Sequence, residues 1–397
     1  MQTQSTYDES AEARHLALRE QFLLDPAWVF LNHGSYGACP RPVFERYQDW
    51  QLQMERQPVE FLGRRLGGLL DESRGILAEY LHVDADEVAY HSNVTTALNV
   101  VARSLPLTDG DEILTTDHEY GALERTWRFI SGHTGARPVV QPLPSHFSSP
   151  EEVVEAVWSG ATPRTRVLFL SHISSFSAVT LPIEPLIKRA RAAGIWTVID
   201  GAHAVGQIPL DLHALGVDFY GGNCHKWLSA PQGAGFLYAR RAMQSLIEPL
   251  VVSWGWQARN PGPSRFIDEQ TRQGTRDYSA YLTVPAAIDF QAEHDWDRVR
   301  LECHELVRYA REGIGALTGL EPLTDDSPAW YGQMASLSLP PGDPLELARR
   351  LREQFQIEIP IMPWQDRRFI RVSAQGYTTR ADIDALLQAL SVLLPRP

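Results

Sequence analysis

An acidic and a basic side chain each follow an apolar, strand-like segment in the middle of the chain. Asp200 ends the segment Ile195–Asp200 (IWTVID), and Lys226 stands between an imidazole and an indole in the sequence HKW. Side chains at the carboxyl ends of parallel strands point into a ligand crevice, and a lysine in such company is atypical of a solvated surface. Each residue also has an ordinary explanation, because Asp200 could cap a helix or turn and Lys226 could lie along a domain edge.

A third segment has the features of a phosphate site. His91–Asn99 (HSNVTTALN) begins as a short strand, breaks into small polar residues and continues as an apolar helical pattern. Backbone N–H groups at a helix start, with hydroxyls beside them, can bind a phosphate. Taken alone, an ordinary N-cap is the better explanation. A phosphate seat, a buried acid and a strand-end amine together suit one cofactor, pyridoxal 5′-phosphate.

Each of these three elements has a chemical task. The lysine forms a Schiff base with the cofactor aldehyde and later moves the proton at Cα. The aspartate keeps the pyridine nitrogen protonated, so that the ring accepts electrons, and the helix start anchors the phosphate. Competing signatures are absent: the sequence has no GxGxxG after a strand, no GxxxxGK[ST], no HExxH and no GxSxG. The 13 histidines show no metal-ligand spacing, so we expect no metal site.

The elements that must position these residues alternate between strands and helices. A helix is predicted over Pro185–Gly194, where a glycine follows the last helical position. Strand, helix and strand at this spacing predict an α/β fold with a mainly parallel central sheet flanked by helices. The predicted strands are Glu112–Thr116, Arg166–Ser171, Ile195–Asp200, Val217–Gly221 and Gly233–Ala239.

The chain divides into three predicted parts. Residues 1–24 resemble an amphipathic N-terminal arm, residues 25–285 form the large cofactor-binding domain, and residues 286–397 form a smaller α+β C-terminal domain. No composition shift marks a flexible linker, so the domains are expected to pack together with a cleft between them. The smaller domain is expected to contain helices at Asp295–Gly319, Leu345–Phe355 and Arg380–Leu394 and a strand at Arg368–Val372.

Composition excludes several other functions. The 397 residues carry a net charge of −13, which argues against nucleic-acid binding and against a polybasic membrane surface. No stretch approaches the ~18 apolar residues of a membrane span, and Met1–Ala13 lacks the apolar core of a signal peptide. The three cysteines lie far apart and form no disulfide framework. We expect a soluble, cytoplasmic protein.

Six ordered motifs resemble the class V aminotransferase superfamily of fold-type I pyridoxal-phosphate enzymes, across nearly the whole chain. Within it, the chain is similar to the isopenicillin N epimerase-like subgroup, which includes C–S lyases of the ergothioneine type. The motifs are FLNHGSYGACPRPV (Phe30–Val43), SNVTTALN (Ser92–Asn99), DGAH (Asp200–His203), HKW (His225–Trp227), QGTRDYSAY (Gln273–Tyr281) and IRVSAQGY (Ile370–Tyr377).

The resemblance implies a role for each matching residue. Lys226 is the Schiff-base lysine, Asp200 pairs with the pyridine nitrogen, and His203 and Ser175 lie near the ring hydroxyl. Phosphate positions are matched by Val94, Thr95, Asn223 and His225, and by Gly274 and Thr275 from a neighbouring subunit. This implies a homodimer with its active site at the interface.

Other assignments from the resemblance leave alternatives open. Arg371 matches the arginine that binds the α-carboxylate of an amino-acid substrate, although a structural ion pair would also explain it. Either His118 or Tyr120 stacks on the cofactor ring. Asn32, His33 and Ser35 lie in a loop beside the substrate, or in a plain turn.

The motifs do not fix the reaction. A C–S lyase or other β-elimination, or a deaminating relative, is weakly favoured over an epimerase or an aminotransferase. An epimerase would need a second base opposite Lys226, from His33, Tyr120 or a partner's tyrosine. The stretch Ile357–Arg371 holds no cysteine, which disfavours persulfide transfer.

Three further hypotheses concern the surroundings of the site. Cys39 is one hypothetical sulfur acceptor. Trp254, Trp256 and Trp364 hint at a roomy aromatic pocket, although aromatic residues are more often core. A scaffold without catalysis would not need Lys226, Asp200 and Arg371 together.

Overall fold

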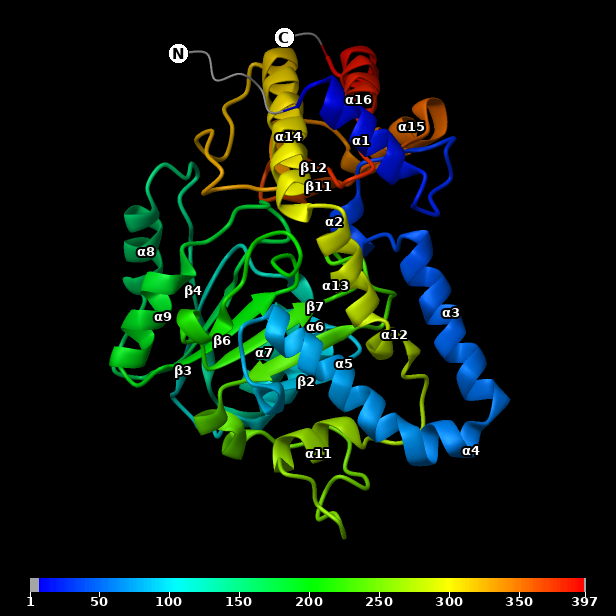
Figure 1. The fold of residues 1–397 in the computed structure, drawn as a ribbon. Helices are drawn as coiled ribbons and strands as arrows, with labels where there is room; N and C mark the ends of the chain where they lie inside the picture. Colours follow the sequence, from blue (N-terminus) through cyan, green and yellow to red (C-terminus); the bar gives the residue numbers. More distant parts are fainter. Residues whose placement is uncertain (1–6, 396–397) are drawn as a thin grey trace.

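The computed structural model describes residues 7–395 and has a seven-stranded sheet at its centre (Figure 1). Each of the five strands predicted from the sequence is present, with ends shifted by no more than two residues. The short strand expected before Ser92 is the edge strand β2, and β4, which was not predicted, forms the other edge. In spatial order the strands are β2 (Val88–His91), β8 (Gly235–Ala239), β7 (Phe219–Asn223), β6 (Trp196–Gly201), β5 (Thr165–Ser171), β3 (Glu112–Thr116) and β4 (Arg137–Gln141).

The strands from β4 to β7 are parallel; β8 runs antiparallel to β7, and β2 pairs antiparallel with β8 at the edge. This confirms the predicted mainly parallel sheet. The reversal at β8 arises because residues 224–234 join it directly to β7, and so short a connection cannot hold a crossover helix. That connection carries Lys226, which therefore stands at the carboxyl end of β7.

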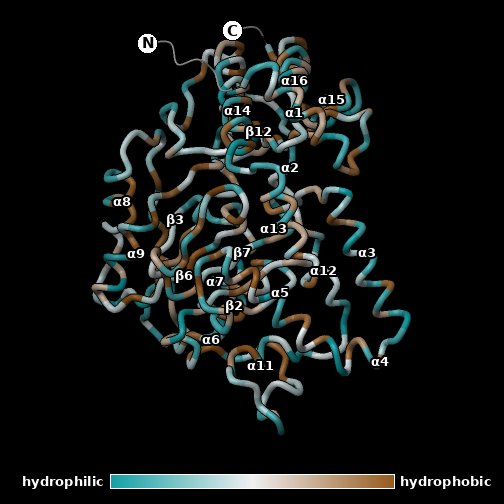
Figure 2. The backbone as a smooth tube through the Cα atoms, viewed as in Figure 1, coloured by the Kyte–Doolittle hydropathy of each residue, from teal (hydrophilic) through white to brown (hydrophobic). Residues whose placement is uncertain are grey.

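Helices cover both faces of the sheet, as its apolar strands require. On one face α6 (Val94–Ser104) and α7 (Gly121–Thr134) pack over side chains such as Phe169 and Phe219. On the other face α8 (Pro150–Trp158) and α9 (Ile183–Ala192) pack over alternate residues of the same strands, among them Leu168 and Ile199. Figure 2 shows hydrophobic residues along the central strands between these layers.

A smaller antiparallel sheet, in the order β11-β12-β9, lies beyond the large one and confirms the predicted α+β C-terminal part. Its strands are β9 (Met334–Leu339), β11 (Ile361–Trp364) and β12 (Arg367–Ser373). Its helices are α14 (Trp296–Thr318), α15 (Pro344–Phe355) and α16 (Arg380–Leu393).

The N-terminal segment belongs spatially with the C-terminal elements. Helix α1 (Glu9–Arg19) lies beside α14 and α16 (Figure 1), and β1 (Val29–Phe30) pairs in parallel with β10 (Ile357–Glu358). Residues 1–6 of the predicted arm lie outside the described residues. The boundary at residue 285 stays a prediction.

The remaining elements are short or connect the main layers. Among them, the helix at Val284–Glu293 (α13) packs against those at Arg41–Arg56 (α3) and Leu66–Tyr80 (α5). No helix within residues 7–395 is long and apolar enough to cross a membrane. These elements are α2 (His33–Tyr36), α3 (Arg41–Arg56), α4 (Pro58–Glu60), η1 (Phe61–Arg65), α5 (Leu66–Tyr80), η2 (Ala85–Glu87), α10 (Leu212–Leu215), η3 (Arg241–Leu246), α11 (Arg265–Thr271), α12 (Ser279–Leu282) and α13 (Val284–Glu293).

A buried carboxylate attaches α1 to α14. Glu302 lies 3.0 Å from Arg14 and 3.2 Å from the ring of His15, both on α1, and 2.9 Å from Arg298 on its own helix. Hydrogen bonds from these side chains lower the pKa of Glu302 to about 2 against its burial. His15 also bonds the carbonyl of Thr378 at 2.7 Å, so this cluster holds the N-terminal helix on the C-terminal part.

Replacing Glu302 by alanine should lower the free energy of unfolding by about 3 kcal/mol, because it leaves His15 buried without its carboxylate. The wild type should lose this contribution as the pH falls from about 4.5, the ordinary carboxyl pKa, to about 2. Urea unfolding of both proteins across that range measures it. Arg349→Ala, which removes exposed pairs on α15, is the control and should change little; equal losses in both variants would contradict the assignment.

Candidate active site

A cavity of about 240 Å³ lies at the carboxyl ends of β5, β6 and β7 and brings together most of the site residues predicted from the sequence. Larger hollows elsewhere, such as those around residues 248–269 and around Gly274, contain neither Lys226 nor Asp200. The cavity is lined by Ser35, Tyr36, Asn93, Val94, Thr95, Tyr120, Ser171, Ile173, Ser175, Asp200, Ala202, His203, Asn223, His225 and Lys226.

Lys226 is half-buried and lines the cavity. Its Nζ lies 3.1 Å from Nε2 of His203. Burial, with the nearby guanidinium of Arg371, lowers the pKa of Lys226 to about 8, while Asp200 acts in the opposite direction. An amine with this pKa is neutral in part near pH 7, which is the form that reacts with an aldehyde.

Asp200 is a buried carboxylate at the end of β6, opposite Ser171 of β5. Burial raises its pKa to about 6, although it accepts a hydrogen bond from the amide of Ala202 at 2.9 Å and lies near the positive charge of Lys226. Asp200 therefore both caps a turn, through the amide of Ala202, and lines the cavity. Such a carboxylate suits a cationic ring N–H as its partner.

The start of α6 offers one free backbone amide. The side chain of Asn93 caps the helix through the amide of Thr96 at 2.9 Å, and the amide of Val94 donates to Oδ1 of Asn223 at 2.9 Å. The amide of Thr95 has no partner among the described protein groups. His225, which also lines the cavity, donates its Nδ1–H to the carbonyl of Ala234 at 2.8 Å.

Arg371 reaches the site from β12 and is 3% exposed. Its guanidinium donates to the carbonyl of Ser175 at 2.5 Å and to Oγ of Ser35 at 3.1 Å, and its Nε has no partner. No carboxylate among residues 7–395 lies within the 4.0 Å of an ion pair, so the structural ion pair considered for Arg371 is absent there. Burial lowers its pKa to about 10, and a buried cation of this kind requires an anion.

The N-terminal loop packs against the backbone of Lys226. His33 is fully buried, and its ring lies 3.0 Å from the carbonyl of Lys226 and 3.0 Å from the hydroxyl of Tyr377. Burial lowers the pKa of His33 to about 4, and it does not line the cavity. Asn32 bonds Ser35 at 2.6 Å and Glu358 at 3.1 Å. Of the loop residues predicted to contact substrate, the structure brings only Ser35 to the cavity.

His118 and Tyr120 lie in different surroundings. Tyr120 lines the cavity and is 47% exposed. His118 is buried beside Ser177, at 3.0 Å, and packs against aromatic rings that include Phe176 and Trp364. The chain turns after Thr116 and directs the imidazole into this aromatic cluster, so the structure does not bring His118 to the cavity.

Gly274 and Thr275 also lie away from the cavity. They line a separate hollow of about 780 Å³ with Trp254 and Tyr278. Within one chain, therefore, these two residues contact none of the groups around Lys226.

Several lining residues were not predicted as site residues, among them Tyr36, Ser171 and Ile173. Ser171 ends a predicted strand, and its register opposite Asp200 is the signal that could have found it. Its amide and hydroxyl both donate to the buried carboxylate of Glu119, at 2.8 and 2.7 Å. Burial raises the pKa of Glu119 to about 7.

The free cysteines lie outside the cavity lining. Cys224 is buried, and Cys39 is partly buried with its pKa raised to about 12 by that burial. A thiol with so high a pKa is a poor sulfur acceptor. Within residues 7–395 no group of three or more His, Cys, Asp or Glu side chains could hold a metal ion.

The chain is similar to known proteins over most of its length. The family model described as Aminotransferase class-V matches residues 37–386. An isopenicillin N epimerase from Amycolatopsis lactamdurans is 41% identical over 395 residues, covering 94% of this chain and 97% of its own. A probable chloroplastic L-cysteine desulfhydrase from Arabidopsis thaliana is 29% identical over 403 residues, covering 93% and 84%. The structure of the cysteine desulfurase CsdA from Escherichia coli matches with a TM-score of 0.80 at 23% identity, covering 96% and 99%, which shows the fold.

A lysine amine of lowered pKa, a buried carboxylate and a helix start that meet at the edge of a mainly parallel sheet define a pyridoxal-phosphate-dependent enzyme. The chain belongs to the class-V aminotransferase family, whose model covers most of its length. This confirms the predicted fold class, family and cofactor, and the relatives match the predicted subgroup.

The site depends on a close approach at Gly37, which has a φ of +76°. A Cβ there would collide with the carbonyl of His225 and lie 3.0 Å from Cα of Lys226. Gly37→Ala should lower the free energy of unfolding by about 2 kcal/mol and weaken cofactor uptake, because the Lys226 segment must move. Urea unfolding and the cofactor absorbance measure the two effects.

Gly132→Ala provides the matched control. Gly132 lies in α7, and a Cβ at this position would have nothing within 4 Å, so the helix should gain up to about 1 kcal/mol. A Gly37→Ala variant that matched this control in stability and cofactor uptake would show that the close approach does not matter.

Proposed function

We propose that this enzyme removes the Cα proton of an α-amino acid from one face and adds a proton to the opposite face, as an epimerase. The observation that carries the proposal is Arg371, a buried guanidinium that bonds two residues of the cavity lining and has no carboxylate partner among the described residues. A substrate α-carboxylate would supply the missing anion and could take a two-pronged hydrogen bond. Ser35 and Ser175, which accept hydrogen bonds from this guanidinium, both line the cavity.

The residues present fit pyridoxal phosphate. The unpartnered amide of Thr95, with Asn223 and His225, would hold the phosphate. Asp200 would pair with the ring nitrogen, and Lys226 would bind the aldehyde carbon. When bound, the cofactor supplies an electron sink that acidifies the Cα–H bond of the attached amino acid.

The side chains then divide the remaining work. Lys226, with its lowered pKa, accepts the Cα proton on one face. Tyr120 lines the cavity and is the proposed stacking residue; as the candidate second base, its hydroxyl would deliver the proton to the opposite face. His33 does not suit that second role, because it is buried and bonded to the Lys226 carbonyl.

The relatives favour epimerisation over elimination. The isopenicillin N epimerase is 41% identical over nearly the whole of both chains, whereas the cysteine desulfhydrase is 29% identical. β-Elimination is the second candidate, because the desulfhydrases share the same family. Persulfide transfer has little support, since no cysteine lines the cavity.

The remaining expectations from the resemblance belong to this proposal. Gly274 and Thr275 would complete the phosphate site of a second copy, which makes the protein a homodimer with two shared sites. A cytoplasmic location stays a prediction. The mass in solution, measured by light scattering, tests the dimer.

Incubating the purified protein with L-amino acids in D₂O should give the D-enantiomers with deuterium at Cα and without keto acid. Chiral chromatography and mass spectrometry measure these products. Lys226→Ala should lose the visible cofactor band and all deuterium exchange. Pyruvate and sulfide from cysteine would instead establish elimination, and a protein that takes up no pyridoxal phosphate would overturn the proposal.

Arg371→Gln should weaken the binding of a substrate amino acid about 100-fold, because charged hydrogen bonds to the carboxylate are lost. The free energy of unfolding should not fall, since the variant removes a buried cation that has no anionic partner among the described residues. Spectral titration with substrate and urea unfolding give the two values.

Arg367→Gln is the control for that variant. Arg367 lies on the same strand but bonds Ser338 and covers the ring of Phe369, so substrate binding should not change. Unchanged binding in Arg371→Gln would remove the carboxylate assignment.

A further inference from the structure

His203 is contacted on its two ring nitrogens by neighbouring residues of one loop. The indole Nε1 of Trp227 lies 3.2 Å from Nδ1 of His203, and Nζ of Lys226 lies 3.1 Å from Nε2. His203 and Trp227 are both buried. The resemblance gives Trp227 no role in the reaction, yet its only polar side-chain atom is directed at a ring that lines the cavity.

The contact with Trp227 determines where the proton on His203 lies. An indole N–H is a donor only, so Nδ1 must accept. Burial, with the charges of Lys226 and Arg371, lowers the pKa of His203 well below its ordinary value, so the ring is neutral. A neutral imidazole carries one proton, and that proton must be on Nε2.

We propose that Trp227 is a positioning residue that holds His203 as the Nε2–H tautomer, so that His203 donates a hydrogen bond into the active site and accepts none from Lys226. In this tautomer the short contact with Lys226 is attractive only when the amine is neutral and offers its lone pair. Trp227 therefore favours the reactive form of Lys226. The consequence for catalysis rests on the proposed function; the tautomer does not.

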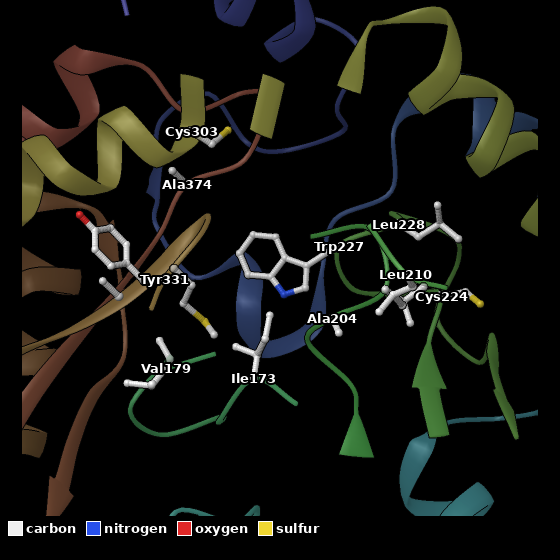
Figure 3. Packing of buried hydrophobic residues seen from close by; sticks show 14 of the residues in the cluster. Ile173, Val179, Ala204, Leu210, Cys224, Trp227, Leu228, Cys303, Tyr331 and Ala374 are labelled. Atoms are coloured by element: carbon white, nitrogen blue, oxygen red, sulfur yellow. The ribbon is translucent and has the colours of Figure 1, made fainter. Parts of the chain in front are cut away.

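The fold fixes both partners of this contact. Gly206 has a φ of +85° and touches the backbone of Trp227 and Leu228 so closely that a Cβ would not fit. Gln207 donates to the carbonyl of His203 at 2.7 Å, and Gln291 donates to the carbonyl of Trp227 at 2.8 Å. Figure 3 shows the indole enclosed by buried side chains, with Ala204 nearby.

The other charged and titratable groups around Lys226 do not replace this effect. Arg371 from β12 lowers the pKa of Lys226 and Asp200 from β6 raises it. Burial lowers the pKa of His225, the preceding residue, and of His33 from α2, so both imidazole rings are uncharged. The opposite tautomer of His203 would accept from the ammonium and raise the pKa of Lys226.

The first test is ¹⁵N NMR of the full-length, histidine-labelled protein, with and without pyridoxal phosphate. His203→Gln identifies the signal of His203 by its loss. The coupling pattern should show a protonated Nε2 and an unprotonated Nδ1 without cofactor. The Nδ1–H tautomer, or an even mixture, would overturn the proposal, and this result does not depend on any activity.

The second test is Trp227→Phe, which keeps an aromatic ring but removes the donor. His203 should then populate the Nδ1–H form, and the pH profile for cofactor uptake should shift upward by about one unit. Uptake at pH 7, followed by absorbance, should then be about tenfold slower. An unchanged profile in a folded variant would contradict the proposal, and if the variant does not fold, the NMR result alone decides.

Trp127→Phe is the control for this variant. Trp127 is a buried tryptophan of α7 that packs on Phe169, on the sheet face covered by α6 and α7. The Trp127→Phe variant should therefore change neither the tautomer of His203 nor the uptake of the cofactor. Failure of the wild type to take up any pyridoxal phosphate would defeat the proposed function but leave the tautomer to be judged by NMR.

Discussion

Buried charge without matching countercharge is the constraint on which the rest of this structure depends. Asp200 and Arg371 are buried, Lys226 is half-buried beside them, and among the described residues none of the three has an ion-pair partner within 4.0 Å. Taking such groups out of water is costly, so the surrounding fold must supply that free energy. The same cost adjusts the chemistry, because burial lowers the pKa of the lysine and raises that of the aspartate.

The fold meets this constraint by covering one sheet edge from several directions. The parallel strands deliver Asp200 to their carboxyl edge, and the direct β7–β8 connection returns Lys226 to the same place. Strand β12 of the small sheet brings Arg371 to this region. The loop around Gly37 packs closely against the Lys226 segment and also covers the region. The cluster at Glu302 holds the N-terminal helix on the C-terminal part and so stabilises this cover.

The sequence predicted well whatever depends on local pattern. Apolar runs predicted the strands, and the residue at the end of each run predicted what would stand at the sheet edge, because parallel strands present their carboxyl ends together. It predicted poorly whatever depends on where a side chain points after a turn. His118 and Tyr120 are two residues apart, and both fit the spacing, yet only Tyr120 reaches the cavity.

The sequence by itself therefore determined the fold class, the family, the cofactor and the lysine and aspartate that serve it, because these follow from periodicity and from short contiguous motifs. Only the tertiary structure decided that Arg371 has no anionic partner among the described residues and that His33 lies beneath the site. It also decided that Trp227 contacts Nδ1 of His203. The reason is physical: burial and hydrogen-bond partners are set by segments far apart in the chain, and no local pattern records them.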